Sequence, residues 1–218
     1  MAAYYPVFID VQDRSCTVIG GGNIGEEKVH KLLECGAKVV VISPEVNDGV
    51  KELADGDKVE WLKRQYQPGD LADAFIAIAA TDDNSVNQLV AKEARDRNVL
   101  LNVVDVTHLC TFIAPSVARR GDVTIATSTG GASPALARKF REELSSSRLL
   151  EYADLTPLLA DARAELKRMG TRLEPDHWQT CITESLLDMV QAGDTEGAKE
   201  TLMAQLLEGA TVATTGDD

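Results

Sequence analysis

The sequence predicts an α/β fold with a doubly wound parallel sheet, and two observations on its first half lead to that prediction. Short segments rich in Val, Ile and Ala alternate with segments whose apolar residues recur at helical spacing. A glycine-rich turn joins the first apolar segment directly to the first helical one. Strands and helices in alternation form a parallel sheet covered on both faces, and its ligands bind outside the carboxyl ends of the strands.

Each expected strand of this sheet is short and apolar, as a strand buried on both faces should be. The strands are expected at residues 15–19, 38–42, 75–80 and 100–103, with a further one at 59–62. Helices are expected at residues 26–35 and 84–97, where charged residues separate apolar ones such as Val29, Leu33 and Val90. These elements account for most of the chain up to about residue 114.

The pattern changes from residue 112 onward. Segments 112–117 and 123–127 flank a turn at 119–122 and predict a β-hairpin. A helix is expected at 135–144, with Ser133 as its N-cap and Pro134 at its first position. Only helical patterns follow, at 148–169, 175–191 and 195–207, and residues 209–218 are expected to fray.

The composition argues against several classes of function. The 218 residues carry a net charge of −13, whereas a general nucleic-acid binder needs a basic face. No apolar run approaches the roughly 20 residues of a membrane span, so we expect no membrane partner and a cytoplasmic protein. The four cysteines form no C-x-x-C pair and the three histidines have no spaced partner. Buried thiols and no metal site are therefore expected.

The glycine turn after the first strand has the spacing of a dinucleotide-binding site. Gly20, Gly22 and Gly25 fit G-x-G-x-x-G: the first allows a tight turn, the second a close approach to a pyrophosphate, and the third close helix packing. The helix that follows directs free N–H groups at the phosphates. The alternative is a glycine turn with a purely structural role. The sequence therefore predicts a Rossmann-like domain that binds NAD.

Polar residues follow the other strands. Ser43 and Pro44 stand where an NAD-binding domain usually has an acidic residue for the ribose, and Ser43 has no charge to repel the 2′-phosphate of NADP. Thr81 and Asp82 either line the cofactor site or belong to the cap of the next helix. After the strand at 100–103 comes Asp105, a carboxylate at the mouth of the expected crevice.

A second turn, rich in glycine and hydroxyl groups, spans residues 128–134 and opens the helix at 135–144. The helix N-terminus and the nearby Arg138, Lys139 and Arg141 suit carboxylates or phosphates. An ordinary well-capped helix is the alternative interpretation.

Seven short motifs in this order resemble the precorrin-2 dehydrogenase family, which includes the N-terminal part of siroheme synthase. They are YPVFI at 5–9, VIGGG at 18–22, EKV at 27–29, AATDD at 79–83, NVVD at 102–105, FIAPS at 112–116 and STGGASP at 128–134. The resemblance covers about residues 4–145, and the helical tail resembles the family's in kind only. Gly25-Glu26-Glu27 departs from the family's usual small and basic residues there.

The resemblance implies NAD-dependent oxidation of precorrin-2 to sirohydrochlorin by a homodimer whose segment after Ala114 exchanges between subunits. It also implies a crevice that holds the tetrapyrrole against the nicotinamide, and some members of the family insert ferrous iron there. The family's cofactor positions fall on Asn23, Ile24, Ser43 and Pro44, and its central carboxylate falls on Asp105.

Dehydrogenation needs a base beside the cofactor, and Asp105, between apolar neighbours, is the best candidate. His108 is the rival base, and a purely structural role for Asp105 is the alternative. The expected cofactor contacts are Gly20, Gly22, Asn23, Ile24, Gly25, Ser43, Pro44, Thr81, Asp82 and Val103. The expected substrate contacts are Asn102, Ser128, Thr129, Gly130, Gly131, Ser133, Arg119, Arg120 and Arg138.

Three domains are expected: an NAD-binding domain at 1–113, a dimerisation segment at 114–147 and a helical domain at 148–218. The fold alone also allows a second function, a non-catalytic NAD-sensing dimer. Asp105 and the turn at 128–134 favour the enzyme, because a sensor does not need them.

Overall fold

The computed structural model describes residues 4–208. It divides into two compact units: residues up to Ala114 with Gly130–Ala132, and Pro115–Thr129 with residues from Ser133 onward. The hairpin, the helix after it and the tail fall in one unit, so their division into a dimerisation segment and a helical domain stays a prediction. No helix in the described part of the chain is long and apolar enough to cross a membrane.

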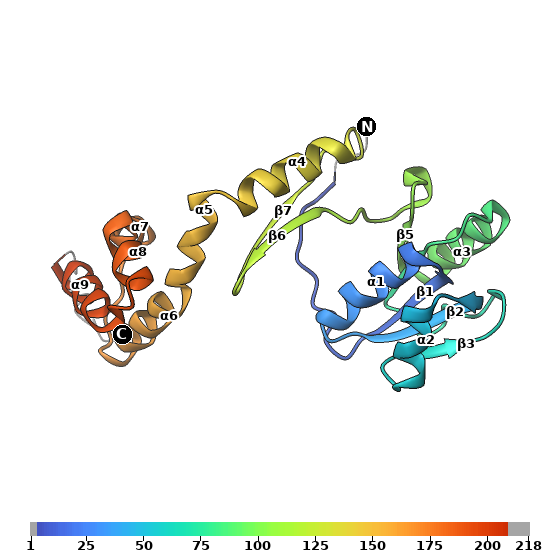
Figure 1. Cartoon of the computed structure of the whole chain (residues 1–218), viewed down its shortest axis with the longest axis horizontal. Helices are drawn as coiled ribbons and strands as arrows, with labels where there is room; N and C mark the ends of the chain where they lie inside the picture. Colours follow the sequence, from blue (N-terminus) through green and yellow to red (C-terminus); the bar gives the residue numbers. More distant parts are fainter. Residues whose placement is uncertain (1–3, 209–218) are drawn as a thin grey trace, which may run out of the picture. The chain divides into compact units, whose positions relative to one another are not determined.

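The first unit contains the predicted doubly wound sheet (Figure 1). Its strands are β1 (Ser15–Gly21), β2 (Lys38–Val46), β3 (Glu60–Leu62), β4 (Ile76–Ala79) and β5 (Leu100–Val103). They pair in parallel in the order β3-β2-β1-β4-β5. The order reverses beside β1, where the chain leaves toward β2 in one direction and returns at β4 in the other. Such a switch point opens a crevice at the carboxyl ends of the strands.

Helices cover both faces of this sheet. They are α1 (Asn23–Glu34), α2 (Asp48–Asp55) and α3 (Asn84–Arg97), with a 3-10 turn, η1, at Thr107–Leu109. One buried cluster packs α1 and α2 against the sheet through Val29 and Val50, and a second packs α3 against it through Val90 and Ala94. Burial of these side chains holds each helix on its face of the sheet.

Three details of the first unit differ from the sequence-based expectations. Strand β2 continues to Val46, so Ser43 and Pro44 lie within the strand. Helix α1 begins at Asn23, directly after the glycine turn. Helix α2 was not expected: Val50, Leu53 and Ala54 do recur at helical spacing and pack against the sheet, but the helix has only eight residues, and so short a pattern is ambiguous.

The second unit begins with the antiparallel hairpin of β6 (Ser116–Arg120) and β7 (Val123–Thr127). Strand β6 starts four residues later than residue 112, where we expected it. Helix α4 (Pro134–Ser145) packs on the hairpin, and Ser133 caps it as predicted. The remaining elements are α5 (Arg148–Glu151), η2 (Tyr152–Leu155), α6 (Thr156–Arg168), α7 (Pro175–Cys181), α8 (Glu184–Gln191) and α9 (Thr195–Glu208). Their core includes Leu155, Leu187 and Leu202. The fraying expected at 209–218 lies outside the described residues.

A buried carboxylate ties α3 to the segment between β3 and β4. Glu93 accepts hydrogen bonds from the Tyr66 hydroxyl, from the N–H groups of Gly69 (2.8 Å) and Leu71 (3.2 Å), and from Arg97 (2.7 Å). Burial alone raises the pKa of Glu93, but these hydrogen bonds together lower it below its ordinary value of 4.5. The folded protein therefore favours the ionised form.

Glu93→Gln should destabilise the first unit by about 2 kcal/mol at neutral pH, because hydrogen bonds to a buried charge are lost. The pKa of Glu93 is lower in the folded than in the unfolded chain, so its contribution is complete above pH 4.5 and is lost as the pH falls through the folded value. Urea unfolding at several pH values, followed by Trp61 fluorescence in a Trp178→Phe background, measures this. Asp96→Asn, which removes an exposed partner of Lys92 on the same helix, should change little. A pH-independent difference would contradict the prediction.

Candidate functional site

The glycines of the turn between β1 and α1 have the geometry that a dinucleotide site needs. Gly20 has φ +109°, and a Cβ there would lie 2.2 Å from the Ala80 carbonyl oxygen. A Cβ at Gly25 would lie 2.2 Å from the Gly20 carbonyl oxygen. A Cβ at Gly22, in contrast, would meet no atom within 4 Å. Gly20 and Gly25 are thus needed for close packing, whereas Gly22 borders open space that a ligand can enter.

Helix α1 starts at this open side. Its first intrahelical bond runs from the Glu26 N–H to the Gly22 carbonyl (2.9 Å), so the N–H groups of Asn23, Ile24 and Gly25 precede the helical ladder. These groups form the positive end of the helix dipole and suit a pyrophosphate. Asn47 Nδ2 donates hydrogen bonds to the Glu26 carboxylate (2.6 Å) and to Asn23 Oδ1 (3.2 Å), so the Glu26 carboxylate has a partner within the protein. The residues present therefore fit a dinucleotide.

Ser43 is less available than its sequence position suggests. Its side chain is buried, and its hydroxyl donates to the Glu45 carbonyl (2.5 Å). Its own carbonyl accepts a hydrogen bond from Trp61 Nε1 (2.9 Å). Pro44 is exposed. A cofactor contact at Ser43 stays a prediction, and it would have to use the hydroxyl oxygen as an acceptor.

Thr81 and its neighbours perform the capping role that was one of our two interpretations. Asp83 caps α3 through the N–H groups of Ser85 (2.9 Å) and Val86 (3.3 Å), and Thr81 Oγ1 accepts from the Asp83 N–H (3.2 Å). Asp82 is exposed and makes no part of this cap. Asn87 was not among the predicted residues: it is buried, and its Nδ2 donates to the Thr81 carbonyl (3.1 Å). Asp82 is exposed and open to a ligand, and a cofactor contact at Thr81 stays a prediction.

Asp105 lies in a strained turn just past the carboxyl end of β5. The turn is closed by a hydrogen bond from the Val106 N–H to the Val103 carbonyl (3.2 Å), and Asp105 has φ +60°. The left-handed conformation is unusual for a residue with a side chain, although Asp and Asn adopt it more readily than most. Asp105 is exposed, whereas Val103, the last residue of β5, is buried. Strained backbone conformations cluster at active sites, so this turn is a candidate position for a catalytic group.

Two other predicted residues lie close to this turn. Asn102 Nδ2 donates to the Phe112 carbonyl (3.2 Å) and lies 3.7 Å from Cys110 Sγ, so its amide group helps to hold the loop together. Its role toward substrate stays a prediction. His108, the rival base, is exposed on η1.

The turn at 128–134 requires its glycines. Gly130 and Gly131 have φ of +62° and +86°, conformations that L side chains rarely adopt. Thr129 Oγ1 accepts from the Ser133 N–H (2.9 Å) and donates to the Ser133 carbonyl (3.0 Å), and Ser133 Oγ caps α4 at the Leu136 N–H (3.2 Å). A Cβ at Gly131 would lie 3.7 Å from Thr107 Cγ2. Gly131 therefore lies beside Thr107, the first residue of η1, which follows Asp105 by two residues in the sequence.

The basic residues expected to meet the substrate have partners of their own. Arg120 binds Asp154 with two hydrogen bonds of 2.7 Å, and this guanidinium holds the pKa of Asp154 below its ordinary value. Arg138 pairs with Glu142 across one helical turn (2.8 Å). Arg119 and Ser128 are exposed. Arg138 can exchange its exposed partner at small cost, whereas Arg120 would have to leave a bidentate pair.

The cysteines and histidines form no metal site in the part of the chain that the structure describes, where no group of three potential ligands gathers. Cys16 and Cys181 are buried as expected, and Cys110 is half-buried. The expectation of a buried thiol is wrong for Cys35, which is exposed at the end of α1.

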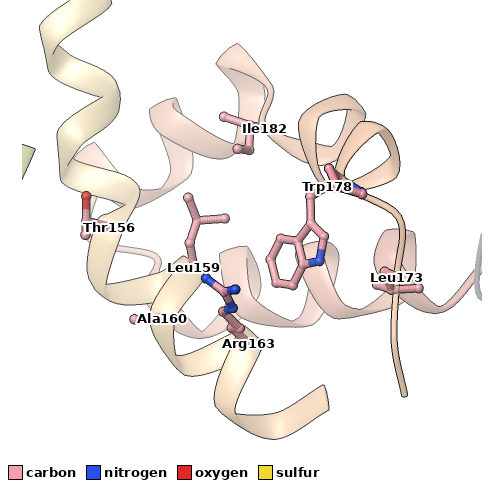
Figure 2. A pocket seen from close by; sticks show the side chains of 8 residues that line it. Thr156, Leu159, Ala160, Arg163, Leu173, Trp178 and Ile182 are labelled. Atoms are coloured by element: carbon pink, nitrogen blue, oxygen red, sulfur yellow. The ribbon is translucent and has the colours of Figure 1, made fainter. Parts of the chain in front are cut away.

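A pocket of about 580 Å³ lies in the second unit, and none of its lining residues is a predicted site residue. Figure 2 shows Leu159, Arg163 and Trp178 around it. Its wall comes from α6, α7 and the residues on either side of α7: Thr156, Leu159, Ala160, Arg163, Leu173, Pro175, Trp178 and Ile182. This lining has no carboxylate or imidazole that could accept a proton, so the candidate site remains at the sheet.

Comparison with known families identifies the class of ligand expected at the glycine turn. A family model described as putative NAD(P)-binding matches residues 7–116, which is half of the 218-residue chain. The chain belongs to this NAD(P)-binding family. The predicted cofactor class is thus confirmed for the first unit. A second model, described as the central part of a sirohaem biosynthesis protein, matches residues 120–147 of this NAD(P)-binding protein.

The relatives confirm the resemblance inferred from the motifs. Siroheme synthase of Methylobacillus flagellatus is 37% identical over 207 residues, which are 94% of this chain and 44% of that protein. Siroheme synthase of Nitrosococcus oceani is 35% identical over 216 residues, 98% of this chain and 46% of that protein. The chain thus spans about half the length of these relatives. The solved structure of SirC, precorrin-2 dehydrogenase, superimposes with a TM-score of 0.72 at 26% identity, covering 94% of this chain and all of SirC.

Proposed function

We propose that this chain catalyses the NAD-dependent oxidation of precorrin-2 to sirohydrochlorin. One observation of the structure carries the proposal: Asp105 is an exposed carboxylate held in a strained turn. This turn and the glycine turn both lie at the carboxyl ends of the parallel strands. A domain that only binds NAD does not need such a carboxylate. The similarity to SirC, precorrin-2 dehydrogenase, extends over the whole of that protein and supports the same reaction.

The reaction removes two hydrogens from the reduced tetrapyrrole. Bound NAD would supply the hydride acceptor for one of them. The other leaves as a proton, for which we propose Asp105 as the acceptor. Because Asp105 is exposed, its carboxyl group can then release the proton to water and return to its starting state.

NAD is proposed over NADP because the end of β2 offers no counter-charge for a 2′-phosphate. Residues 43–48 read Ser-Pro-Glu-Val-Asn-Asp, with two acidic residues and no basic one. An NADP site at this place usually has an arginine. The proposed phosphate contacts are the N–H groups of Asn23, Ile24 and Gly25, with Thr81, Asp82 and Val103 completing the cofactor site.

The substrate carries many carboxylates, and an acidic protein must meet them with local positive groups. We propose Arg119 and Arg138 for this role, with the polar turn of Ser128, Thr129, Gly130, Gly131 and Ser133. Arg120 takes part only if its ion pair with Asp154 opens. Asn102 Oδ1 is proposed as a further acceptor for a pyrrole N–H.

Ferrous iron insertion is proposed as a second activity of the same carboxylate. Iron is a substrate here, and its insertion requires that pyrrole nitrogens lose their protons. A single exposed base can receive those protons in turn, so Asp105 suits both steps.

Incubation with precorrin-2 and NAD, with and without ferrous iron, tests the function. Sirohydrochlorin in the absorption spectrum supports the dehydrogenase, and sirohaem supports the second activity. An unchanged spectrum, with NAD bound, would contradict the proposal and favour the alternative, a non-catalytic NAD sensor.

The active form is proposed to be a homodimer built from residues 114–147. A lone two-stranded hairpin is marginally stable, and α4 leaves Leu136 (45%) and Phe140 (49%) exposed one turn apart. We expect light scattering to give the mass of a dimer, and Phe140→Glu to give that of a monomer. Lys139→Glu, the adjacent charge reversal, should remain a dimer. A monomeric wild-type protein at micromolar concentration would refute this arrangement.

A further inference from the structure

The turn that carries Asp105 needs support, because its third residue has an unfavourable backbone. The turn has a single backbone hydrogen bond of its own, from Val106 to Val103, at 3.2 Å. Asp105 at φ +60° loses stability relative to an ordinary conformation, and the surroundings must compensate for that loss. The side chain that contacts both ends of the turn is the thiol of Cys110.

Cys110 Sγ lies at the base of this turn. It accepts a hydrogen bond from the Val103 N–H at 3.1 Å, and it lies 3.2 Å from the Val103 carbonyl oxygen and 3.5 Å from the Val106 carbonyl oxygen. A thiol has one proton, so it donates to one of these carbonyls at a time. The sulfur therefore always holds the Val103 N–H, and its proton binds either the Val103 or the Val106 carbonyl.

The sheet explains why a side chain takes this place. Strand β5 is the last in the order β3-β2-β1-β4-β5, so one of its edges has no neighbouring strand. Residues 110–112 return along that edge: the Thr111 N–H donates to the Leu101 carbonyl (2.8 Å), and Thr111 Oγ1 accepts from the Leu101 N–H (2.7 Å). At Val103, the last residue of β5, Cys110 supplies the partner that a further strand would provide.

The thiol is suited to donate as well as accept. Burial raises the pKa of Cys110 above its ordinary value, by more than the hydrogen bond from Val103 lowers it. The group therefore stays protonated at neutral pH. A protonated, half-buried thiol is also a poor nucleophile, which fits a role in positioning.

We propose that Cys110 is a positioning residue for the reaction: its thiol fixes the turn from Val103 to Val106 so that the Asp105 carboxylate faces the substrate. The inference rests on the proposed role of Asp105. In this role Cys110 acts through the carboxylate and needs no contact with the substrate.

Cys110→Ala should lower kcat about tenfold, because a carboxylate displaced by a fraction of an ångström accepts the proton poorly. The KM for precorrin-2 and the calorimetric Kd for NAD should stay close to the wild-type values. Cys110→Ser, whose hydroxyl also donates and accepts, should recover most of the loss. Cys35→Ala, an exposed cysteine in the same unit, serves as the matched control and should leave kcat unchanged. Equal kcat in Cys110→Ala and wild type would overturn the inference.

Combination with Asp105→Asn separates positioning from a general loss of stability. Once the carboxylate is gone there is nothing left to position, so Cys110→Ala should add no further loss of kcat to Asp105→Asn. Losses that multiply would refute the inference, while the proposed function would stand. If Asp105→Asn alone keeps wild-type turnover, the proposed catalytic role of Asp105 fails first.

A spectroscopic measurement does not depend on the Ala variant. The S–H stretching band of Cys110, assigned by the infrared difference between wild type and Cys110→Ser, should have the lowered frequency of a hydrogen-bonded thiol. A band at the frequency of a free thiol would contradict the contacts on which the inference is built, even if Cys110→Ala does not fold.

Discussion

Gly22→Asp should abolish NAD binding while the protein stays folded. Gly22 has φ −83°, which any residue adopts, and a Cβ there meets no protein atom within 4 Å. The new side chain therefore causes no strain within the chain, but it places a negative charge where the pyrophosphate should lie, beside the N-terminus of α1. We expect calorimetry to detect no binding at NAD concentrations that saturate the wild type, with an unchanged thermal unfolding temperature.

Two variants serve as controls for this result. Gly22→Ala adds volume without charge, so its NAD affinity should fall between those of the wild type and Gly22→Asp. Gly20→Ala, in contrast, should lower stability even without NAD, because Gly20 has φ +109° and its Cβ would lie 2.2 Å from the Ala80 carbonyl oxygen. If the Gly22→Asp protein is folded and binds NAD with wild-type affinity, the cofactor does not bind at this turn.

Asp105→Asn should reduce turnover by about 10² to 10⁴, the usual effect of losing a general base. The substitution keeps the size of the side chain and removes its basicity. It is also the least disruptive change for the backbone, since Asn tolerates the φ of +60° found at this position. NAD affinity and thermal stability should therefore match the wild type, and single-turnover kinetics should show that the chemical step is slowed.

His108→Ala is the comparison for Asp105→Asn, because His108 is exposed on the same loop and was the rival base. We expect His108→Ala to keep most of the wild-type turnover. If Asp105→Asn retains full turnover and His108→Ala does not, the base is His108. If Asp105→Asn unfolds the protein, the role of Asp105 is structural.

The parallel sheet could be predicted because its signals are local. Helix α3 and strand β5 begin and end at the expected residues. For the helix, Asp83 before it and Asn98 after it are residue types that favour helix ends. The spacing of Gly20, Gly22 and Gly25 likewise predicted the dinucleotide-binding turn. Helix α2 was missed because it has only eight residues, although Val50, Leu53 and Ala54 form an apolar face.

Contacts between residues distant in the sequence could not be predicted. The Arg120–Asp154 pair joins residues 34 apart, and no pattern indicates it. The positions of Ser43 and Cys110 depend on where β2 ends and on how the chain returns along β5. A cysteine without a spaced partner looks like any buried thiol, so the contacts of Cys110 with the Asp105 turn became visible only in the structure.

The yield of NADH per molecule of sirohydrochlorin tests the central claim most directly. Precorrin-2 and excess NAD are mixed with the protein under anaerobic conditions, and both products are followed by absorbance in one sample. We expect one NADH for each sirohydrochlorin formed, and neither product with Gly22→Asp. Sirohydrochlorin formed without NADH, or formed equally fast by Gly22→Asp, would contradict it.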